Sequence, residues 1–173
     1  RADMAAQSLY QIARGLLRRL RPANLDALGL VAALQELCES WEARGGVACV
    51  FHADAMDEAL PERINIAVYR VAQEALTNVT RHADASQVRL ALARDAAGWL
   101  CLTIADDGRG MDPARVTRGL GLLGANERAV ALGGELRADS APGAGVRLTL
   151  RIPLPGLGVP AVDPVSEPGK AAA

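Results

Sequence analysis

Four polar side chains between residues 74 and 82 combine metal-binding and phosphate-binding chemistry at helical spacing. On a helix, Glu74, Asn78 and Arg81 fall on one row at the border of an apolar stripe. The amide oxygen of Asn78 suits a hard cation that keeps water and phosphate oxygens as its other ligands. Glu74 can act as a general base or orient a metal-bound water, and Arg81 and His82 can meet phosphate charge. The row alone also fits an ordinary solvated helix edge. The stripe consists of Ile64, Val68, Val71, Ala75 and Val79.

A second candidate is the acidic and glycine-rich segment from Asp106 to Gly110. Asp106 continues the alternation of the apolar residues at 100–104, so its carboxylate points toward the core. A carboxylate there is costly unless it accepts hydrogen bonds, and the exocyclic amine of adenine is a suitable donor. Gly108 and Gly110 let the backbone turn and approach a flat ring closely. By itself, the segment also fits a calcium loop or an ordinary turn.

A third candidate is the glycine pattern of residues 119–124, which leads directly into an expected helix. Free backbone N–H groups and the helix dipole make such a start a phosphate cradle. No βαβ unit surrounds it, which argues against a dinucleotide fold. A Walker-type phosphate loop is absent. The pattern comprises Gly119, Leu120, Gly121, Leu122, Leu123 and Gly124.

The helices and strands that position these residues are predicted from the spacing of apolar residues and from the glycines and prolines that interrupt regular structure. Asn24 or Asp26 can cap a helix that Gly45 and Gly46 end, and Pro61 can open the next one. Helices followed by strands in hairpins predict an α+β fold, with helices on one face of a mixed, mostly antiparallel sheet. We expect helices at about 4–20, 24–44, 61–82 and 121–132, and strands at about 47–53, 88–92, 100–104, 135–139 and 145–152.

Composition narrows the class of protein. Of 173 residues, 50% are hydrophobic and only 3% aromatic, so the core must consist of small and aliphatic side chains. A net charge of −1 argues against a module that binds duplex DNA. No apolar run approaches the roughly 18 residues of a membrane span. The cysteines, at positions 38, 49 and 101, match no metal or redox spacing and are interpreted as plain buried thiols.

Together, the three segments resemble the N, G1 and G2 boxes of the GHKL ATPases, which share the two-layer Bergerat fold. Within that superfamily, the chain resembles sensor histidine kinases of the nitrate/nitrite-sensor type over about residues 15–153. The supporting segments lie at 20–22, 25–30, 69–78 and 119–124, followed by Glu127 and Arg128.

The resemblance implies a role for each site residue. Asn78 would hold Mg²⁺, Glu74 would assist phosphoryl transfer, and Asp106 would read the adenine of ATP. Arg81 and His82 would flank the phosphates. The segment 111–118 would form a lid that is mobile until nucleotide orders it. The remaining nucleotide-binding positions would be Gly108, Gly110, Gly119, Leu120, Gly121, Leu122 and Gly124.

The resemblance also implies partners and a domain plan. A response regulator with a LuxR-like DNA-binding domain would receive the phosphoryl group. The full kinase would be a homodimer that acts in the cytoplasm, either free or anchored in the bacterial inner membrane. Residues 1–22 would belong to the dimerisation helix, 23–153 to the catalytic domain and 154–173 to a disordered tail. No phosphoacceptor motif is present, so the acceptor histidine would lie upstream of Arg1.

One position departs from the family pattern, and two other functions remain open. Val146 follows Gly145 where the family often has threonine or serine, which puts a hydroxyl contact near the phosphates in doubt. Another GHKL ATPase, such as an anti-sigma-factor serine kinase, is one alternative. A nucleotide-binding module without catalysis is the other, and the presence of Glu74 and Asn78 counts against it.

Overall fold

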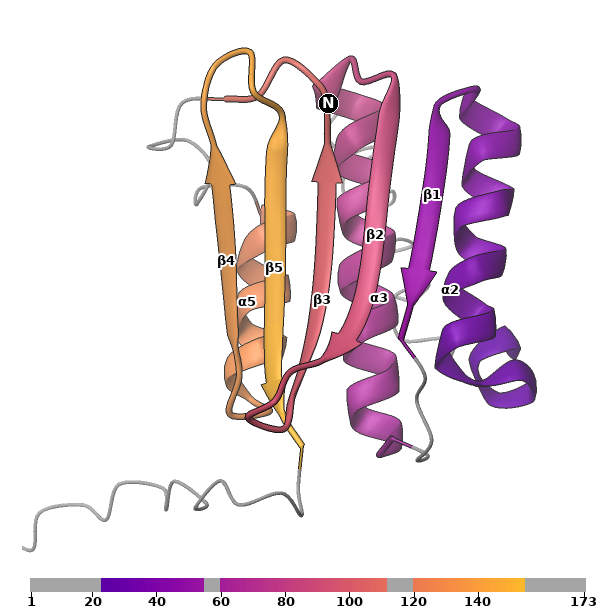
Figure 1. Cartoon of the computed structure of the whole chain (residues 1–173), viewed down its shortest axis with the longest axis vertical. Coiled ribbons are helices and arrows are strands. Elements are labelled where there is room, and N and C mark those ends of the chain that lie inside the picture. The colour runs from indigo at the N-terminus through magenta and orange to yellow at the C-terminus, as the bar shows by residue number, and fades with distance from the viewer. Residues whose placement is uncertain (1–22, 55–59, 112–119, 155–173) are drawn as a thin grey trace, which may run out of the picture.

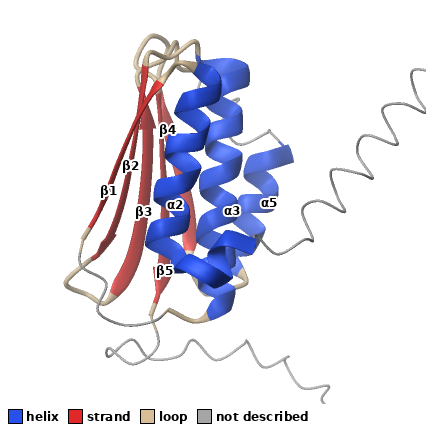
Figure 2. Cartoon of the chain, turned by 90° about the vertical axis from the view of Figure 1, so that its right-hand side faces the viewer, coloured by secondary structure: helices blue, strands red, loops and turns tan. Residues whose placement is uncertain are grey.

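One sheet and one layer of helices make up the described part of the chain (Figures 1 and 2). The computed structural model describes residues 23–54, 60–111 and 120–154. The helix expected at 4–20, Gly119, the tail after residue 154 and all of the expected lid except Met111 lie outside these ranges. The helices lie on one face of the sheet, as the α+β prediction requires (Figure 2).

The sheet is mixed, with the strand order β1-β2-β3-β5-β4. β1 pairs with β2 in parallel, and the other neighbours are antiparallel, which confirms the predicted sheet. A parallel pair needs a long crossover, and a helix between β1 and β2 supplies it. The strands are β1 (Ala48–Ala53), β2 (Gln87–Arg94), β3 (Trp99–Asp106), β4 (Glu135–Ser140) and β5 (Val146–Pro153).

The first described helix, α2 (Ala23–Gly45), is interrupted near its start. Gly29 has φ 77° and ψ 171°, values outside any helix, so the prediction of one continuous helix from Asn24 or Asp26 was wrong there. Glycine adopts positive φ without the steric cost that a Cβ imposes. After the break, Leu34 and Trp41 pack into the core on the predicted stripe.

The crossover helix α3 (Glu62–Asn78) begins directly after Pro61, as predicted. It does not continue as an α-helix to His82, because a π-helical turn, η1 (Val79–Ala83), replaces its expected last turn. Asp84 then ends the turn with φ 53°. Such π turns are rare and are frequent at functional sites.

The C-terminal half follows the prediction closely. Helix α5 (Leu120–Val130) ends in a turn in which Gly133 has φ 71°. In the hairpin between β2 and β3, the N–H of Asp95 donates to Trp99 O at 2.9 Å. A second hydrogen bond, of 2.9 Å, joins Trp99 N to the carboxylate of Asp95.

The core lies between the sheet and the helices and is aliphatic, as composition predicts. No polar or charged residue is fully buried among the described residues. None of the described helices is long and apolar enough to cross a membrane. The largest fully buried side chains include Leu34, Ile64, Leu76, Leu90, Leu92, Leu100, Leu102, Leu150 and Ile152.

The other face of the sheet carries a charged cluster around Arg151. This guanidinium lies 2.7 Å from the carboxylate of Asp95 and 3.4 Å from that of Glu135, and 4.9 Å from the ring centre of Trp99. These side chains are partly exposed, so this face is polar in keeping with its lack of covering helices.

Candidate functional site

The fold brings the three candidate segments to one end of the sandwich. α3 runs alongside β3 in the same direction, so Asn78 at the end of α3 and Asp106 at the end of β3 lie at the same end (Figure 1). α5 runs the opposite way, toward the start of β4, so its N-terminus points to that same end (Figure 1). Three segments that are separate in the sequence therefore lie at one end of the fold.

The polar row of α3 lies beside the core as far as Asn78. Glu74 and Asn78 are half-buried, and all five residues of the predicted apolar stripe are buried. Arg81 and His82 lie in η1 and are exposed, so Arg81 is not on the half-buried border where helical spacing placed it. The π turn explains this difference, because hydrogen bonding from i to i+5 changes the angular spacing of the residues after Asn78.

Trp41 and Thr80 form a contact that sequence patterns did not reveal. Trp41 Nε1 on α2 donates a 2.9 Å hydrogen bond to Thr80 Oγ1 in η1. Thr80 Oγ1 in turn donates to the carbonyl of Leu76 at 3.1 Å. The π turn that carries Arg81 and His82 is thus attached to α2. The only sequence signal was a tryptophan at the end of an otherwise aliphatic stripe.

The loop after β3 is held between η1 and the β4–β5 turn. Arg109 donates from its backbone N to Ala83 O at 2.8 Å and from its Nε to His82 O at 2.6 Å. On the other side, Gly143 N donates to Arg109 O at 2.6 Å. Half-buried Asp106 begins this loop, and its Oδ1 accepts the N–H of Gly108 at 2.9 Å.

The glycines of this loop are required by contacts within the protein. A Cβ on Gly108 would overlap with the carbonyl of Ala83, and one on Gly110 would overlap with that of Ala141. Gly110 also has φ 62°, in the left-handed region. The sequence predicted these glycines for close approach to a nucleotide ring, but the groups that approach them here are backbone carbonyls.

Asp107, next to Asp106, has a structural role. Its carboxylate accepts hydrogen bonds from Ser86 N at 2.8 Å and Gln87 N at 2.9 Å, and also from the Ser86 hydroxyl. The Ser86 hydroxyl and these N–H groups lower the pKa of Asp107. The carboxylate therefore fastens the start of β2 to the end of β3, and Asp106 is the member of the pair that faces the candidate site.

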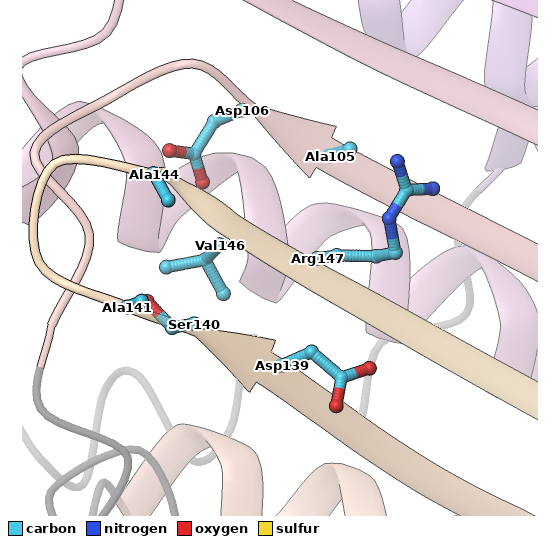
Figure 3. A pocket seen from close by; sticks show the side chains of 8 residues that line it. All are labelled: Ala105, Asp106, Asp139, Ser140, Ala141, Ala144, Val146 and Arg147. Carbon is cyan, nitrogen blue, oxygen red and sulfur yellow. The ribbon is translucent and has the colours of Figure 1, made fainter.

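A pocket of about 370 Å³ opens beside Asp106. Figure 3 shows the side chains of Asp106 and Val146 directed toward the same space. Position 146, where the family often has threonine or serine, therefore lies beside the residue expected to read adenine. The pocket is lined by Ala105, Asp106, Asp139, Ser140, Ala141, Ala144, Val146 and Arg147.

Ser140 supplies a hydroxyl to this pocket that the sequence analysis missed. It pairs with Val146 across β4 and β5. Its hydroxyl donates to Gly145 O at 2.7 Å and accepts the N–H of Met111 at 2.9 Å. Ser140 thus joins the β4–β5 turn to the start of the segment expected to be the lid. A serine at a strand end gave no signal that distinguished it from an ordinary turn residue.

The third segment differs in its local structure from the predicted loop. Helix α5 already begins at Leu120, so Gly121, Leu122 and Gly124 lie within the helix and not before it. Leu122 packs against the core, which leaves only its backbone for any ligand. Gly119 lies outside the described residues. Gly124 has room for a side chain, because a Cβ at this position would lie 3.6 Å from Arg128 Nη1.

The described residues at this end of the molecule offer few ligands for a metal ion. Within the ranges that the structure describes, no group of three or more histidine, cysteine or acidic side chains could hold one. The half-buried amide of Asn78 fits a hard cation whose other ligands are waters and phosphate oxygens.

Comparison with protein families gives a match over most of the described domain. The model of a family described as "Histidine kinase-, DNA gyrase B-, and HSP90-like ATPase" matches residues 64–156. This stretch runs from the start of α3 through β5 and includes all three candidate segments.

Curated relatives and solved structures agree with this match. The signal transduction histidine-protein kinase/phosphatase UhpB of Salmonella typhimurium is 40% identical over 157 residues, which cover 86% of this chain and 30% of UhpB. The sensor histidine kinase MctS of Rhizobium johnstonii is 40% identical over 144 residues, covering 81% of this chain and 31% of MctS. The blue-light activated histidine kinase of Erythrobacter litoralis EL346 superposes with a TM-score of 0.63 at 26% identity, covering 72% of this chain and 42% of that one. The chain thus spans less than a third of the length of these curated relatives.

Proposed function

Since the chain belongs to the histidine kinase-, DNA gyrase B- and HSP90-like ATPase family, we propose that it transfers the γ-phosphoryl group of ATP to a histidine side chain. Its relatives identify it as the ATP-binding catalytic domain of a sensor histidine kinase. The observation that carries the proposal is the meeting of Asn78, Asp106 and the N-terminus of α5 at one end of the sandwich.

The adenine end of the site is the pocket beside Asp106. Oδ1 of this carboxylate is held by Gly108 N–H, which fixes its orientation and leaves Oδ2 to accept the exocyclic amine of adenine. Guanine presents a carbonyl oxygen at the equivalent position, which would face the carboxylate without a proton between them. Ser140 and the β4–β5 turn form the opposite wall. ATP is therefore favoured over GTP.

The phosphate end lies between α3 and α5. Asn78 contributes one oxygen ligand to Mg²⁺, which neutralises phosphate charge when it is bound together with ATP. Glu74, one turn earlier on α3, accepts the proton from the attacking histidine nitrogen or orients a metal-bound water. Arg81 and His82 are exposed in η1 and meet the phosphates from outside. The N–H groups at the start of α5 bind phosphate oxygens.

The acceptor is placed outside this chain. His52 lies on the edge strand β1, 3.5 Å from Asp54, and His82 lies in η1 among the residues expected to contact phosphate, so we assign neither as the acceptor. We place the acceptor histidine before Arg1, on a dimerisation hairpin that residues 1–22 would complete, within a cytoplasmic homodimer. A response regulator with a LuxR-like output domain would then take the phosphoryl group.

Two measurements test this function. Calorimetry should show ATP binding at micromolar to sub-millimolar concentration that requires Mg²⁺, and Asn78→Ala should remove most of it. Mixing the chain with an upstream hairpin that carries the acceptor histidine should give acid-labile label from γ-labelled ATP. ATP binding without such label would reject the kinase in favour of a nucleotide-binding module, and acid-stable label on serine would indicate a serine kinase of the same superfamily.

A further inference from the structure

Two cysteines on consecutive elements lie where α2 packs against the edge strand β1. Cys38 lies on the buried face of α2, between Leu34 and Trp41, and is only 1% exposed. Cys49 pairs in register with fully buried Val88, which places it on the face of the sheet that the helices cover. It is partly exposed and packs against the core cluster that contains Cys38.

The two side chains lie on the surfaces with which α2 and β1 pack against each other. One turn after Cys38, Glu42 accepts the backbone N–H of Cys49 through Oε2 at 3.3 Å, which holds the same two elements together. A hydrogen bond from Cys38 lowers the pKa of Cys49, whereas that bond and burial raise the pKa of Cys38. The partly exposed thiol is thus the more easily ionised one.

We propose that Cys38 and Cys49 form a reversible disulfide, a site of oxidative modification that joins α2 covalently to β1. The proposal rests on the positions of the two cysteines on the packed faces of α2 and β1 and on the hydrogen bond from Cys49 N to Glu42, and it is independent of nucleotide binding. Sequence spacing alone indicated plain buried thiols, because the pairing depends on α2 turning back along β1.

The oxidant is a low-molecular-weight disulfide such as oxidised glutathione. The thiolate of Cys49 attacks one of its sulfurs, forms a mixed disulfide and expels one glutathione thiolate. Cys38 then loses its proton and attacks the sulfur of Cys49, which expels the second glutathione. Both cysteines are oxidised, one disulfide is reduced to two thiols, and reduced glutathione reverses the sequence.

Formation of the disulfide should alter the position of η1 through the hydrogen bond from Trp41. A disulfide holds its sulfurs about 2.05 Å apart, closer than a hydrogen-bonded thiol pair, so α2 must shift toward β1. Trp41 lies one turn beyond Cys38 on the same face of α2 and donates a hydrogen bond to Thr80 in η1. The fluorescence of the Trp41 indole should therefore change when the disulfide forms.

The test uses the whole chain with Cys101→Ser, so that only the proposed pair can react. After equilibration with oxidised glutathione, remaining thiols are alkylated and the protein is analysed by mass spectrometry without reduction. We expect loss of both alkylation sites, a mass lower by two hydrogens, and a Cys38–Cys49 cross-linked peptide that reduction removes. Adding Trp99→Phe leaves Trp41 as the emitter, whose fluorescence should shift on oxidation and return on reduction.

Matched variants separate this result from general thiol reactivity. Cys49→Ser and, separately, Cys38→Ser should abolish the cross-link and the fluorescence shift, with circular dichroism checking that each variant is folded. A glutathione adduct on Cys49 that persists beside a free Cys38 would overturn the proposal. So would a disulfide between two chains, or two alkylatable thiols at every glutathione ratio in the folded protein.

Discussion

Trp41 Nε1 lies 2.9 Å from Thr80 Oγ1, and this hydrogen bond connects α2 to the π turn at the end of α3. Thr80 lies between Asn78, the expected metal ligand, and Arg81, an expected phosphate contact. α2 is therefore bonded to the turn that carries two residues expected to contact phosphate. Any displacement of α2 acts on η1 directly.

Replacing either member of this pair should reveal their coupling. Trp41→Phe keeps an aromatic ring but removes the donor, and Thr80→Val removes the acceptor with little change of shape. Each should lower the free energy of unfolding by about 1 kcal/mol, measured by urea denaturation. In a double-mutant cycle the combined loss should be smaller than the sum. Additive losses would show that the bond does not couple the two elements.

Asp106→Asn tests which base the pocket reads. The substitution exchanges an acceptor-only carboxylate for an amide that has lost the charge assisting the bond to adenine. A hydrogen bond to a charged group contributes about 1.5–3 kcal/mol, so ATP affinity should fall roughly 10- to 100-fold in calorimetry. Binding of GTP should fall much less. Equal effects on the two nucleotides, or none, would remove adenine recognition from Asp106.

The sequence predicted the sheet well because strand alternation and hairpin turns are local signals. Leu100 and Leu102, for instance, are buried as their spacing requires. The break at Gly29 and the end of α3 at Asn78 were missed, because packing on other elements decides where a helix stops. The same holds for the site. Local chemistry singled out Asp106, whereas the partners that fix its loop come from chain segments distant in sequence.

Asp107→Asn is the matched control for Asp106, with a different expected outcome. The pKa of Asp107 is lowered in the folded state, so its contribution to stability is complete above the unfolded-state value of about 4. That contribution disappears as the pH falls through the lower folded-state pKa. Asp107→Asn should therefore be less stable than the wild type at pH 7, and the difference should shrink below about pH 4. Denaturation curves at several pH values measure it; a constant difference would contradict the role assigned to Asp107.

Gly110→Ala should be strongly destabilising, and Gly124→Ala should not. At Gly110, φ is 62° and a Cβ would overlap with Ala141 O, so strain of about 1–3 kcal/mol is expected. Gly124 lies in α5, and a Cβ there would lie 3.6 Å from Arg128 Nη1. Alanine therefore fits and should stabilise the helix by up to about 1 kcal/mol. Thermal unfolding of the two variants should move in opposite directions. A stable Gly110→Ala protein would show that the loop can adopt another path.

Val146→Thr tests whether the pocket lacks a hydroxyl that it can use. Val146 is half-buried in the pocket beside Asp106, and Ser140 across the strand pair has its hydroxyl engaged by Gly145 and Met111. A threonine at position 146 has nearly the shape of valine and adds a donor and acceptor next to the adenine site. We expect ATP affinity to rise several-fold, by about 1 kcal/mol, with little change in unfolding free energy.

Ser140→Ala, by contrast, should weaken both stability and ATP binding, because it releases Gly145 and Met111 together. If Val146→Thr left ATP affinity unchanged while Ser140→Ala lowered it, the pocket would be shaped by Ser140 alone, and the valine would be a neutral replacement.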